Sequence, residues 1–429
     1  MTRQAKSRSF TAAVFSLSAT HPNYGIIPLK IWGLTPQIQE KIHISMAWAL
    51  SILGFMFFWS TFVVFCGLSV GLLRRKAKRS SPLGEDDCKT RFACVICAHN
   101  EERVIARPIS SILAARYPKD MLEVVVFADN CSDRTAEIAS SFPGVRVMEK
   151  KTPSGGKGDV LAWGLDIIRN DGYDAIAVFD ADNEMDPSWL LEMDAAFRSG
   201  ASVVTGHRMS SNPFVNLITG WYTLYWNLMN ELSNRVRSNL NLSSMLTGTG
   251  FGFKVSVLPQ KGWRTRTFVE DLEFAFFCNL DGYRVFYVPD AVFYDEQPVK
   301  LRPMLRQLNR WATGGLQILR YYVWSWFKAL CRRPSFRLFD CFAIITLGAC
   351  GSLLLFLNAV TLNWRFALWF LALAWASAIL STALSRHSIR SLLLPIATFP
   401  LFTVILSCTV LYSAIRPQKS WKPIEHGCS

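Results

Sequence analysis

The stretch Ala-Ile-Ala-Val-Phe-Asp-Ala-Asp-Asn, residues 175–183, decides how this chain is interpreted. It predicts a buried strand, because an apolar run with Val and Phe is followed abruptly by two acids. Asp180 and Asp182 stand one residue apart at the carboxyl end of that strand, where ligands bind in open α/β sheets. Acids at i and i+2 can both reach one hard cation, and Mg²⁺ or Mn²⁺ prefers such oxygen ligands together with substrate phosphates. A lone Asp-x-Asp is more often an acidic turn, so the metal assignment depends on the rest of the chain.

The composition indicates a protein that has both a membrane part and a charged, folded part. Of the 429 residues, 51% are hydrophobic and 18% are charged, which fits neither an ordinary soluble protein nor a pure membrane bundle. The net charge of +14 includes a basic run directly after an apolar stretch, namely Arg74, Arg75, Lys76, Lys78 and Arg79. This run fits the positive-inside rule and anionic lipid headgroups. Because no nucleic-acid motif is visible, we expect a lipid bilayer and not nucleic acid as its partner.

Apolar segments lie toward both ends of the chain. Residues 44–73 carry no charge and predict one transmembrane helix, whose C-terminal end the basic run holds in the cytoplasm. Residues 302–330 mix Arg and Lys with Trp, Leu and Tyr, which is typical of a helix at the membrane interface. Three uncharged stretches within 341–415 are each long enough to span, and three crossings would leave the end of the chain outside. These patterns predict a multi-pass protein of the cell membrane. They leave open whether residues 1–43 lie on the membrane, enter it or stay disordered.

Residues 91–300 alternate strands and helices, in the pattern of a parallel sheet in a nucleotide-binding fold. The first four predicted strands are joined by predicted helices of 9 to 15 residues, as in βαβ units. The expected strands are Arg91–Cys97, Glu123–Ala128, Val145–Glu149, the Asp180 strand, Ser202–Gly206, Gly250–Val257 and Val285–Tyr294, with helices near 102–116, 133–141, 157–169, 214–238 and 272–280.

Polar side chains follow the first two of these strands. The first strand ends in Ala98-His99-Asn100-Glu101-Glu102, and the second ends in Ala128-Asp129-Asn130. Two adjacent strand ends that bear polar groups make a crevice, in which a carboxylate such as Asp129 can accept hydrogen bonds from a nucleobase or ribose. An ordinary turn acid is the alternative interpretation of Asp129.

Two further clusters stand at predicted helix starts. In Ser154-Gly155-Gly156-Lys157-Gly158 the glycines let the backbone approach a phosphate, and Lys157 could pair with a diphosphate, although the spacing is not that of a P-loop. Glu270 and Asp271 precede the helix predicted at 272–280, whose N-terminus stabilises an ionised carboxylate and aims it into a site. A simple turn and ordinary capping are the alternatives for these two clusters.

A last polar cluster lies on the predicted interfacial helix. Gln307, Arg310 and Trp311 are spaced i, i+3 and i+4, so they share one helix face. Arg310 offers a bidentate contact to phosphate, and Trp311 offers a flat apolar face for stacking on a sugar. An amphipathic helix with its Arg among the lipid headgroups is the alternative.

In their order along the chain, these clusters resemble the membrane-integrated members of glycosyltransferase family 2, the group of cellulose, hyaluronan, chitin and poly-N-acetylglucosamine synthases. Residues 98–102 stand where the family has an Ala-Tyr-Asn-Glu-like turn, with His99 in place of Tyr. The resemblance covers roughly residues 91–325, and its departures concern base recognition more than the reaction class. The other matches are Asp129 at the nucleoside aspartate, Gly155-Gly156-Lys157 at the Gly-Gly-Lys turn, Asp180-Ala181-Asp182 at the metal Asp-x-Asp, Val269-Glu270-Asp271 at Thr-Glu-Asp, and Gln307 to Trp311 at Gln-x-x-Arg-Trp.

The resemblance implies a cytosolic GT-A domain beside an α-helical transmembrane region. It also implies an inverting transfer from a nucleotide sugar, with UDP-sugar as the expected donor, to a growing β-linked polysaccharide. Asp271 would then be the general base, and Asp180 with Asp182 would hold Mg²⁺ or Mn²⁺. The expected nucleotide-sugar contacts are His99, Glu101, Asp129, Lys157, Asp180 and Arg310, and the expected acceptor contacts are Glu270, Gln307 and Trp311.

Two alternatives stay open. The acceptor could be a lipid in a non-processive transfer, as in polyprenyl-phosphate or diacylglycerol glycosylation, although the Gln-x-x-Arg-Trp match favours polymer synthesis. The chain could instead be a non-catalytic membrane subunit that binds a nucleotide sugar, against which the intact acids Asp180, Asp182 and Asp271 argue. An export or accessory subunit also stays open as a partner, because it would leave no trace in this sequence.

Overall fold

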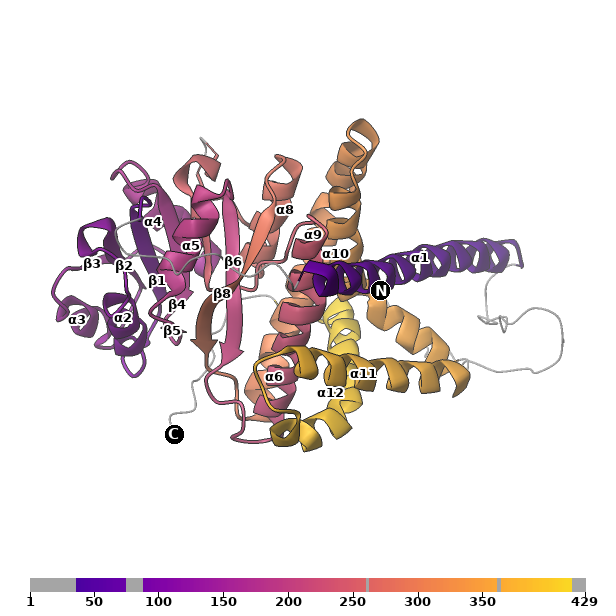
Figure 1. Ribbon diagram of the computed structural model, residues 1–429. Helices are drawn as coiled ribbons and strands as arrows, with labels where there is room; N and C mark the ends of the chain where they lie inside the picture. The colour runs from indigo at the N-terminus through magenta and orange to yellow at the C-terminus, as the bar shows by residue number, and fades with distance from the viewer. Residues whose placement is uncertain (1–35, 75–87, 260–261, 361–363, 419–429) are drawn as a thin grey trace, which may run out of the picture.

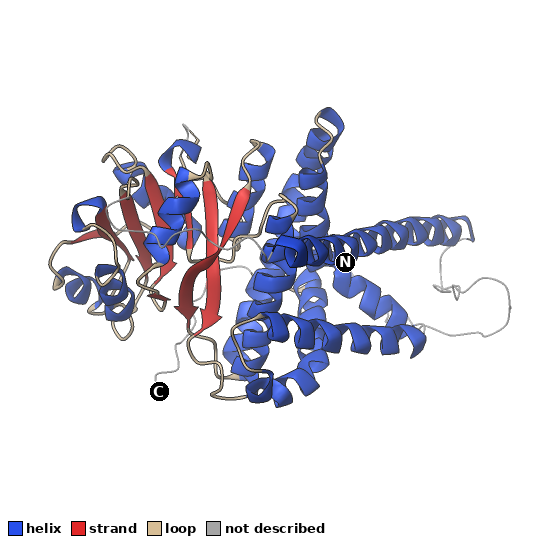
Figure 2. Cartoon of the chain, viewed as in Figure 1, coloured by secondary structure: helices blue, strands red, loops and turns tan. Residues whose placement is uncertain are grey.

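The computed structural model describes residues 36–74, 88–259, 262–360 and 364–418, drawn in colour in Figure 1. Within these ranges an α/β part with the sheet lies beside a group of long helices (Figure 2). The interpretations of residues 1–35 and of most of the basic run, residues 75–79, fall outside the described residues.

One eight-stranded sheet forms the centre of the α/β part. Its strands are β1 (Phe92–Ala98), β2 (Leu122–Asp129), β3 (Val145–Lys150), β4 (Ala175–Asp180), β5 (Glu184–Met185), β6 (Val203–Ser210), β7 (Phe251–Lys254) and β8 (Val285–Asp295). They lie in the order β3-β2-β1-β4-β7-β6-β8-β5. The short strand β5 is absent from the sequence prediction, because two residues carry no periodic pattern.

The predicted parallel pairing holds among β3, β2, β1 and β4, and again between β6 and β8. β1 pairs in parallel with β2 and β4, and β2 pairs in parallel with β3. β7 runs antiparallel to both β4 and β6, so the sheet is mixed. The turn before β7 lies at the carboxyl edge of the sheet, where the carbonyl oxygen of Gly248 accepts a 2.7 Å hydrogen bond from Lys157. Because β7 starts from this edge, it runs in the direction opposite to β4.

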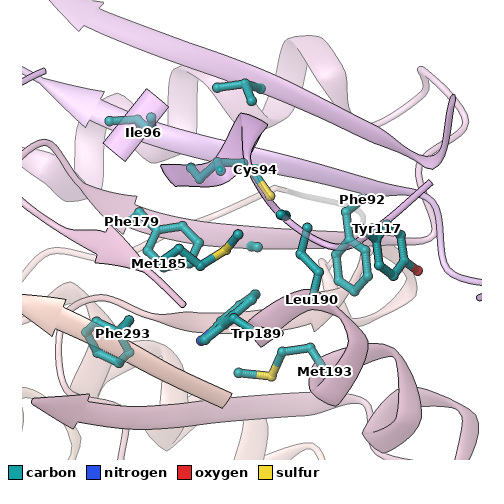
Figure 3. Close-up of a cluster of buried hydrophobic side chains, with 14 of the residues drawn as sticks. Phe92, Cys94, Ile96, Tyr117, Phe179, Met185, Trp189, Leu190, Met193 and Phe293 are labelled. Atoms are coloured by element: carbon teal, nitrogen blue, oxygen red, sulfur yellow. The ribbon is translucent and has the colours of Figure 1, made fainter. Parts of the chain in front are cut away.

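Helices cover both faces of the sheet, because successive residues of its strands point to opposite sides. Phe92, Cys94 and Ile96 of β1 pack with α2 (Ala106–Leu113), α3 (Thr135–Ser140) and α5 (Trp189–Arg198), in the cluster of Figure 3. Ala93 and Val95 pack on the other face with α4 (Lys157–Ile168) and α8 (Glu270–Leu280). α2 is shorter than the helix predicted near 102–116, because the four residues before it form a turn held by the carbonyl oxygen of Glu101.

The long helices form the second part of the molecule. Two segments in the described ranges are long and apolar enough to cross a membrane, Ser51–Leu72 and Ile389–Ile415, and the apolar segment Leu368–Leu384 is shorter. The full set of four membrane-spanning helices therefore stays a prediction. The helices are α1 (Pro36–Arg74), α9 (Leu301–Arg332), α10 (Phe336–Val360), α11 (Trp364–Leu384) and α12 (Leu393–Ile415).

The helix predicted at 214–238 connects the two parts in three pieces. They are α6 (Leu217–Leu228), a π-helical segment over Met229–Arg235, and α7 (Val236–Asn239). Asn216 begins α6 with a capping box, and its side chain accepts hydrogen bonds from the backbone of the first turn. α7 lies so close to α1 that a Cβ atom at Gly67 would stand 2.5 Å from the Cβ of Val236.

The helix α12 contacts α6 near its start and α9 near its end. Near its start, Trp221 of α6 donates a 2.9 Å hydrogen bond to Thr398. At its end, Ser413 donates to Asn309 of α9 at 2.5 Å. Beyond it, the backbone N–H of Gln418 donates to Thr313 of α9 at 3.2 Å. Tertiary contacts thus hold residue 418 beside α9, and the expectation that a last crossing leaves the end of the chain outside stays a prediction.

Candidate active site

The ends of β1, β2 and β4 lie side by side, since Cys97 of β1 stands in register with both Phe127 of β2 and Asp180 of β4. The residues after these strands therefore meet at one edge of the sheet. The Nδ1 atom of His99 lies 2.5 Å from the carbonyl oxygen of Asp129. Asn130, in the left-handed region at φ 47°, donates a 2.8 Å hydrogen bond to the Asp129 carboxylate.

A cavity of about 1230 Å³ opens beyond this edge and brings together every site residue predicted from the sequence. The residues come from strand ends, from the starts of α4 and α8, and from the middle of α9. Their individual roles stay predictions. The predicted residues that line the cavity are His99, Glu101, Asp129, Lys157, Asp180, Asp182, Glu270, Asp271, Gln307, Arg310 and Trp311.

Lys157 joins the glycine-rich turn to the first acid of Asp-x-Asp. Its Nζ atom donates to Asp180 Oδ1 at 2.5 Å and lies 4.0 Å from Glu270 Oε1. Burial by itself would lower the pKa of Lys157, but the carboxylates of Asp180 and Glu270 outweigh it and hold that pKa above its usual range. Lys157 therefore carries a fixed positive charge at the carboxyl edge of the sheet.

The donor set of Asp180 and Asp182 fits a hard divalent cation. Both carboxylates line the cavity, and the Asp182 carboxylate is oriented by a 3.1 Å hydrogen bond from Asn183. Among the described residues no group of three or more His, Cys, Asp or Glu is placed to hold a metal. Mg²⁺ and Mn²⁺ keep waters and substrate phosphates as ligands, so two carboxylates suit them, whereas a structural zinc site would need more protein ligands.

The two acids of α8 lie inside the helix and not before it, because α8 begins at Glu270. Both are buried, with 7% of Glu270 and 8% of Asp271 exposed. Burial raises the pKa of Glu270 to about 7. Burial also raises the pKa of Asp271, and hydrogen bonds from the backbone N–H groups of Leu272 and Gly248 offset this in part. Burial therefore opposes the ionised form that the sequence analysis expected the helix N-terminus to stabilise.

α9 is held against the start of α8. A Cβ atom at Gly314 would stand 2.6 Å from the side chain of Val269, so only glycine permits this approach. Trp311 stacks on Tyr225 with 5.9 Å between ring centroids. Two cavity-lining residues of α9 each have a buried atom with no hydrogen-bond partner within the described ranges, namely Gln307 Oε1 and Arg310 Nε. Unpaired buried polar atoms at a cavity wall indicate a ligand that satisfies them.

A buried polar network behind the Asp-x-Asp turn was missed by the sequence analysis. Asn183 donates to both Asp182 and Asp295, at 3.1 and 2.8 Å. Arg208 pairs with Asp295 at 2.5 Å, and its guanidinium lies 3.7 Å from the centroid of the Trp226 ring. Only the position of Asn183 next to Asp182 could have signalled this network, because Arg208 and Asp295 meet through the pairing of β6 with β8.

Curated relatives match part of this chain. A probable glycosyltransferase of Bacillus subtilis is 28% identical over 271 residues, which are 61% of this chain and 64% of the relative. A β-monoglucosyldiacylglycerol synthase of Trichormus variabilis is 28% identical over 239 residues, 52% of this chain and 48% of the relative. A poly-β-1,6-N-acetyl-D-glucosamine synthase of Staphylococcus epidermidis is 26% identical over 259 residues, which are 59% of this chain and 61% of the relative. The chain thus spans less than two thirds of the length of each.

The fold also has a counterpart among solved structures. A mannosyltransferase from Pyrobaculum calidifontis, solved with GDP-mannose and Mn²⁺, superposes with a TM-score of 0.55 at 17% identity, covering 85% of this chain and 97% of that chain. This likeness supports a GT-A-like mixed α/β fold. The family model described as "Glycosyltransferase like family 2" matches residues 90–314, which is more than half of the chain. The chain therefore belongs to glycosyltransferase family 2.

Proposed function

We propose that this chain is a membrane-bound inverting glycosyltransferase that moves a sugar from a UDP-sugar to a hydroxyl group of its acceptor. One observation carries the proposal: the cavity joins cationic Lys157 and the pair Asp180 and Asp182 with the buried acid Asp271. The first three suit a nucleoside diphosphate, and the last suits a proton acceptor for the attacking hydroxyl.

The donor would lie along the ends of β1, β2 and β4. Asp129, which is 7% exposed, would accept hydrogen bonds from the nucleoside, with His99 and Glu101 beside it. Lys157 and Arg310 would contact the diphosphate, and Arg310 Nε would gain the partner that it lacks among the described residues. Asp180 and Asp182 would hold Mg²⁺ or Mn²⁺, which would neutralise charge on the diphosphate.

The acceptor hydroxyl would face Asp271. As its oxygen forms a bond to the anomeric carbon, Asp271 takes its proton, and the bond from that carbon to the diphosphate breaks on the opposite side. UDP leaves, and the configuration at the carbon inverts. Gln307, Trp311 and Glu270 would position the acceptor, with Trp311 stacked on Tyr225 to present a flat aromatic face.

The resemblance and the relatives support two acceptor classes, a glycan and a lipid. The Gln-x-x-Arg-Trp pattern favours a growing β-linked polysaccharide, with the catalytic domain in the cytoplasm and an export or accessory subunit as a further partner. One relative is named as a glycolipid synthase and another as a polysaccharide synthase. A purely binding subunit is the least favoured, because it would have no use for a buried acid at position 271.

The test is a panel of radiolabelled UDP-sugars offered to the purified chain in the presence of Mg²⁺ or Mn²⁺. Products are separated into lipid-extractable, polymeric and small water-soluble fractions and sized. We expect turnover of one UDP-sugar that is lost in the Asp271→Asn variant. If the wild-type chain and this variant release UDP equally slowly from every donor, the proposed activity is refuted.

A further inference from the structure

The cavity does not end at the acids. It continues between α1, α10, α11 and α12, and we name this continuation the helical chamber. Most of the residues that line it have aliphatic or aromatic side chains. Representative lining residues are Phe57 of α1, Leu347 of α10, Trp369 and Phe370 of α11, and Leu406 and Val410 of α12.

The helical chamber offers little hydrogen bonding to a ligand. Among its described lining residues from these four helices, none is charged. Of the three hydroxyls that line it, those of Thr61 and Thr403 are already bonded to carbonyl oxygens of their own helices, at 3.0 and 2.7 Å, and that of Ser60 has no partner within the described ranges. A glycan that moved into this space would lose many hydrogen bonds between its hydroxyl groups and water. The helical chamber would not replace most of them, so the transfer would cost free energy. An alkyl chain would gain free energy with every methylene that leaves water.

The helical chamber also opens sideways, toward the surface that long apolar helices present to a bilayer. Phe57 is 45% exposed, Trp369 is 76% exposed and Leu373 is 45% exposed, although all three line the chamber. Figure 1 shows α1 and α11 both extending away from the sheet. A lipid can therefore slide in from the side, with its headgroup toward Asp271 and its chains between the helices.

The charges at the inner end decide what kind of headgroup fits. The cations that line the cavity in the described ranges are Lys157, Arg208, Arg237 and Arg310. The first three are in ion pairs, with Asp180, Asp295 and Asp340 respectively, at 2.5, 2.5 and 2.8 Å. The proposed function assigns Arg310 to the donor diphosphate, so among the described residues that line the cavity no unpaired cation is left for a lipid phosphate.

We propose that the acceptor is a neutral, hydroxyl-bearing lipid of the diacylglycerol class, whose alkyl chains occupy the helical chamber. This inference rests on the proposed function and names its acceptor. The lipid hydroxyl gives its proton to Asp271 as its oxygen bonds to the anomeric carbon, and UDP departs with the electrons of the broken bond. The product is a glycolipid that leaves by the same lateral opening.

Two glycines of α10 allow the helical chamber to be filled without disturbing the fold. A Cβ atom at Gly348 or Gly351 would meet no described heavy atom within 4 Å, and both residues line the chamber. They lie at i and i+3, on one face of the helix. Gly348→Leu and Gly351→Leu therefore project into open space, and leucine also favours a helix more than glycine does. Leu368→Phe on α11 is the matched control, because Leu368 is 56% exposed and does not line the cavity.

Two measurements test each variant: transfer from the UDP-sugar to dioleoylglycerol in mixed micelles, and retention of radiolabelled dioleoylglycerol by the purified chain. We expect each leucine variant to lose roughly tenfold or more in both. The control should stay within about twofold of wild type, and binding of the UDP-sugar should be unchanged in all three. Dioctanoylglycerol, with shorter chains, should be affected less than dioleoylglycerol.

Three outcomes overturn the inference. One is wild-type retention of dioleoylglycerol by both leucine variants. Another is transfer only to water-soluble oligosaccharides. The third is equal retention of a phosphatidylcholine probe, which would mean that ordinary bilayer lipid fills the space. The retention measurement needs no turnover, so it tests the inference even if no UDP-sugar is consumed. An absence of UDP-sugar consumption would refute the proposed function separately.

Discussion

Arg237 and Asp340 form a two-point ion pair, with Nε to Oδ2 at 2.8 Å and Nη2 to Oδ1 at 3.2 Å, and both side chains are almost fully buried. The indole N–H of Trp59 donates to the same carboxylate at 3.0 Å. Asp340 thus fixes α10 to α7 and to α1 at one point. These contacts set where the walls of the helical chamber stand relative to Glu270 and Asp271.

Asp340→Asn should destabilise the chain strongly. Removal of one partner of a buried pair leaves Arg237 without compensation, which costs on the order of 3–5 kcal/mol. Asp290→Asn is the control, because Asp290 and Arg386 are about half exposed and such pairs contribute roughly 0–1 kcal/mol. Thermal unfolding in one detergent should show a much lower midpoint for Asp340→Asn only. Equal midpoints for the two variants would contradict this role of Asp340.

Turnover should depend strictly on Mg²⁺ or Mn²⁺. The chain offers two carboxylates, Asp180 and Asp182, and the diphosphate must complete the coordination. UDP release should stop in excess EDTA and return when Mg²⁺ is added back. Asp182→Asn should stay inactive at every Mg²⁺ concentration. Undiminished turnover in excess EDTA would remove the metal assignment.

Asp271→Asn should separate chemistry from binding. A general base contributes roughly 10²–10⁴-fold to the rate, about 3–5 kcal/mol of barrier, and Asn keeps the shape of the side chain. We expect kcat to fall by that factor, while the affinity for the UDP-sugar, measured by calorimetry, stays at the wild-type value. If the variant keeps more than about a tenth of the wild-type kcat, Asp271 is not the base and Glu270 becomes the candidate.

Donor affinity should weaken as pH rises through about 7. Burial raises the pKa of Glu270 to about 7, so Glu270 is neutral below that pH and ionised above it. Its carboxylate lies 4.0 Å from Lys157, and in the ionised form it competes with the diphosphate for that charge. UDP-sugar affinity is measured from pH 6 to 8 in wild type and in Glu270→Gln, which mimics the neutral form.

The variant should bind equally well across this range, at the affinity that wild type shows at low pH. Glu296→Gln is the control, because Glu296 lines the same cavity but pairs with Arg107 at 3.3 Å. It should keep the wild-type pH dependence. A pH dependence that survives in Glu270→Gln would assign the titration to another group.

A topology reporter fused after Ser429 should lie on the same side of the membrane as the catalytic domain. The backbone N–H of Gln418 donates to Thr313, which lies on α9 two residues after Trp311. Eleven residues then remain to Ser429, too few for a helix across a bilayer, which needs about 20. A reporter that is active only in the cytoplasm should be active here, and a silent reporter would support the predicted last crossing instead.

The sequence by itself determined the candidate site to a large extent. Strand patterns followed by acids located Asp129 and Asp180, and helix spacing located Gln307, Arg310 and Trp311. These signals are local, because periodicity within about ten residues reports which face is buried and where a strand ends. For that reason all the predicted site residues line one cavity.

Tertiary structure alone decided the features that depend on distant segments. The antiparallel direction of β7, the pairing of Arg208 with Asp295 and the position of Gln418 beside α9 each join residues far apart in the chain. Patterns in a single sequence cannot report such contacts. The contacts arise from packing between elements, whereas a pattern reports only the periodicity within one helix or strand. The pKa of Glu270 and the apolar helical chamber follow from the same packing, since burial and enclosure are properties of the assembled helices and sheet.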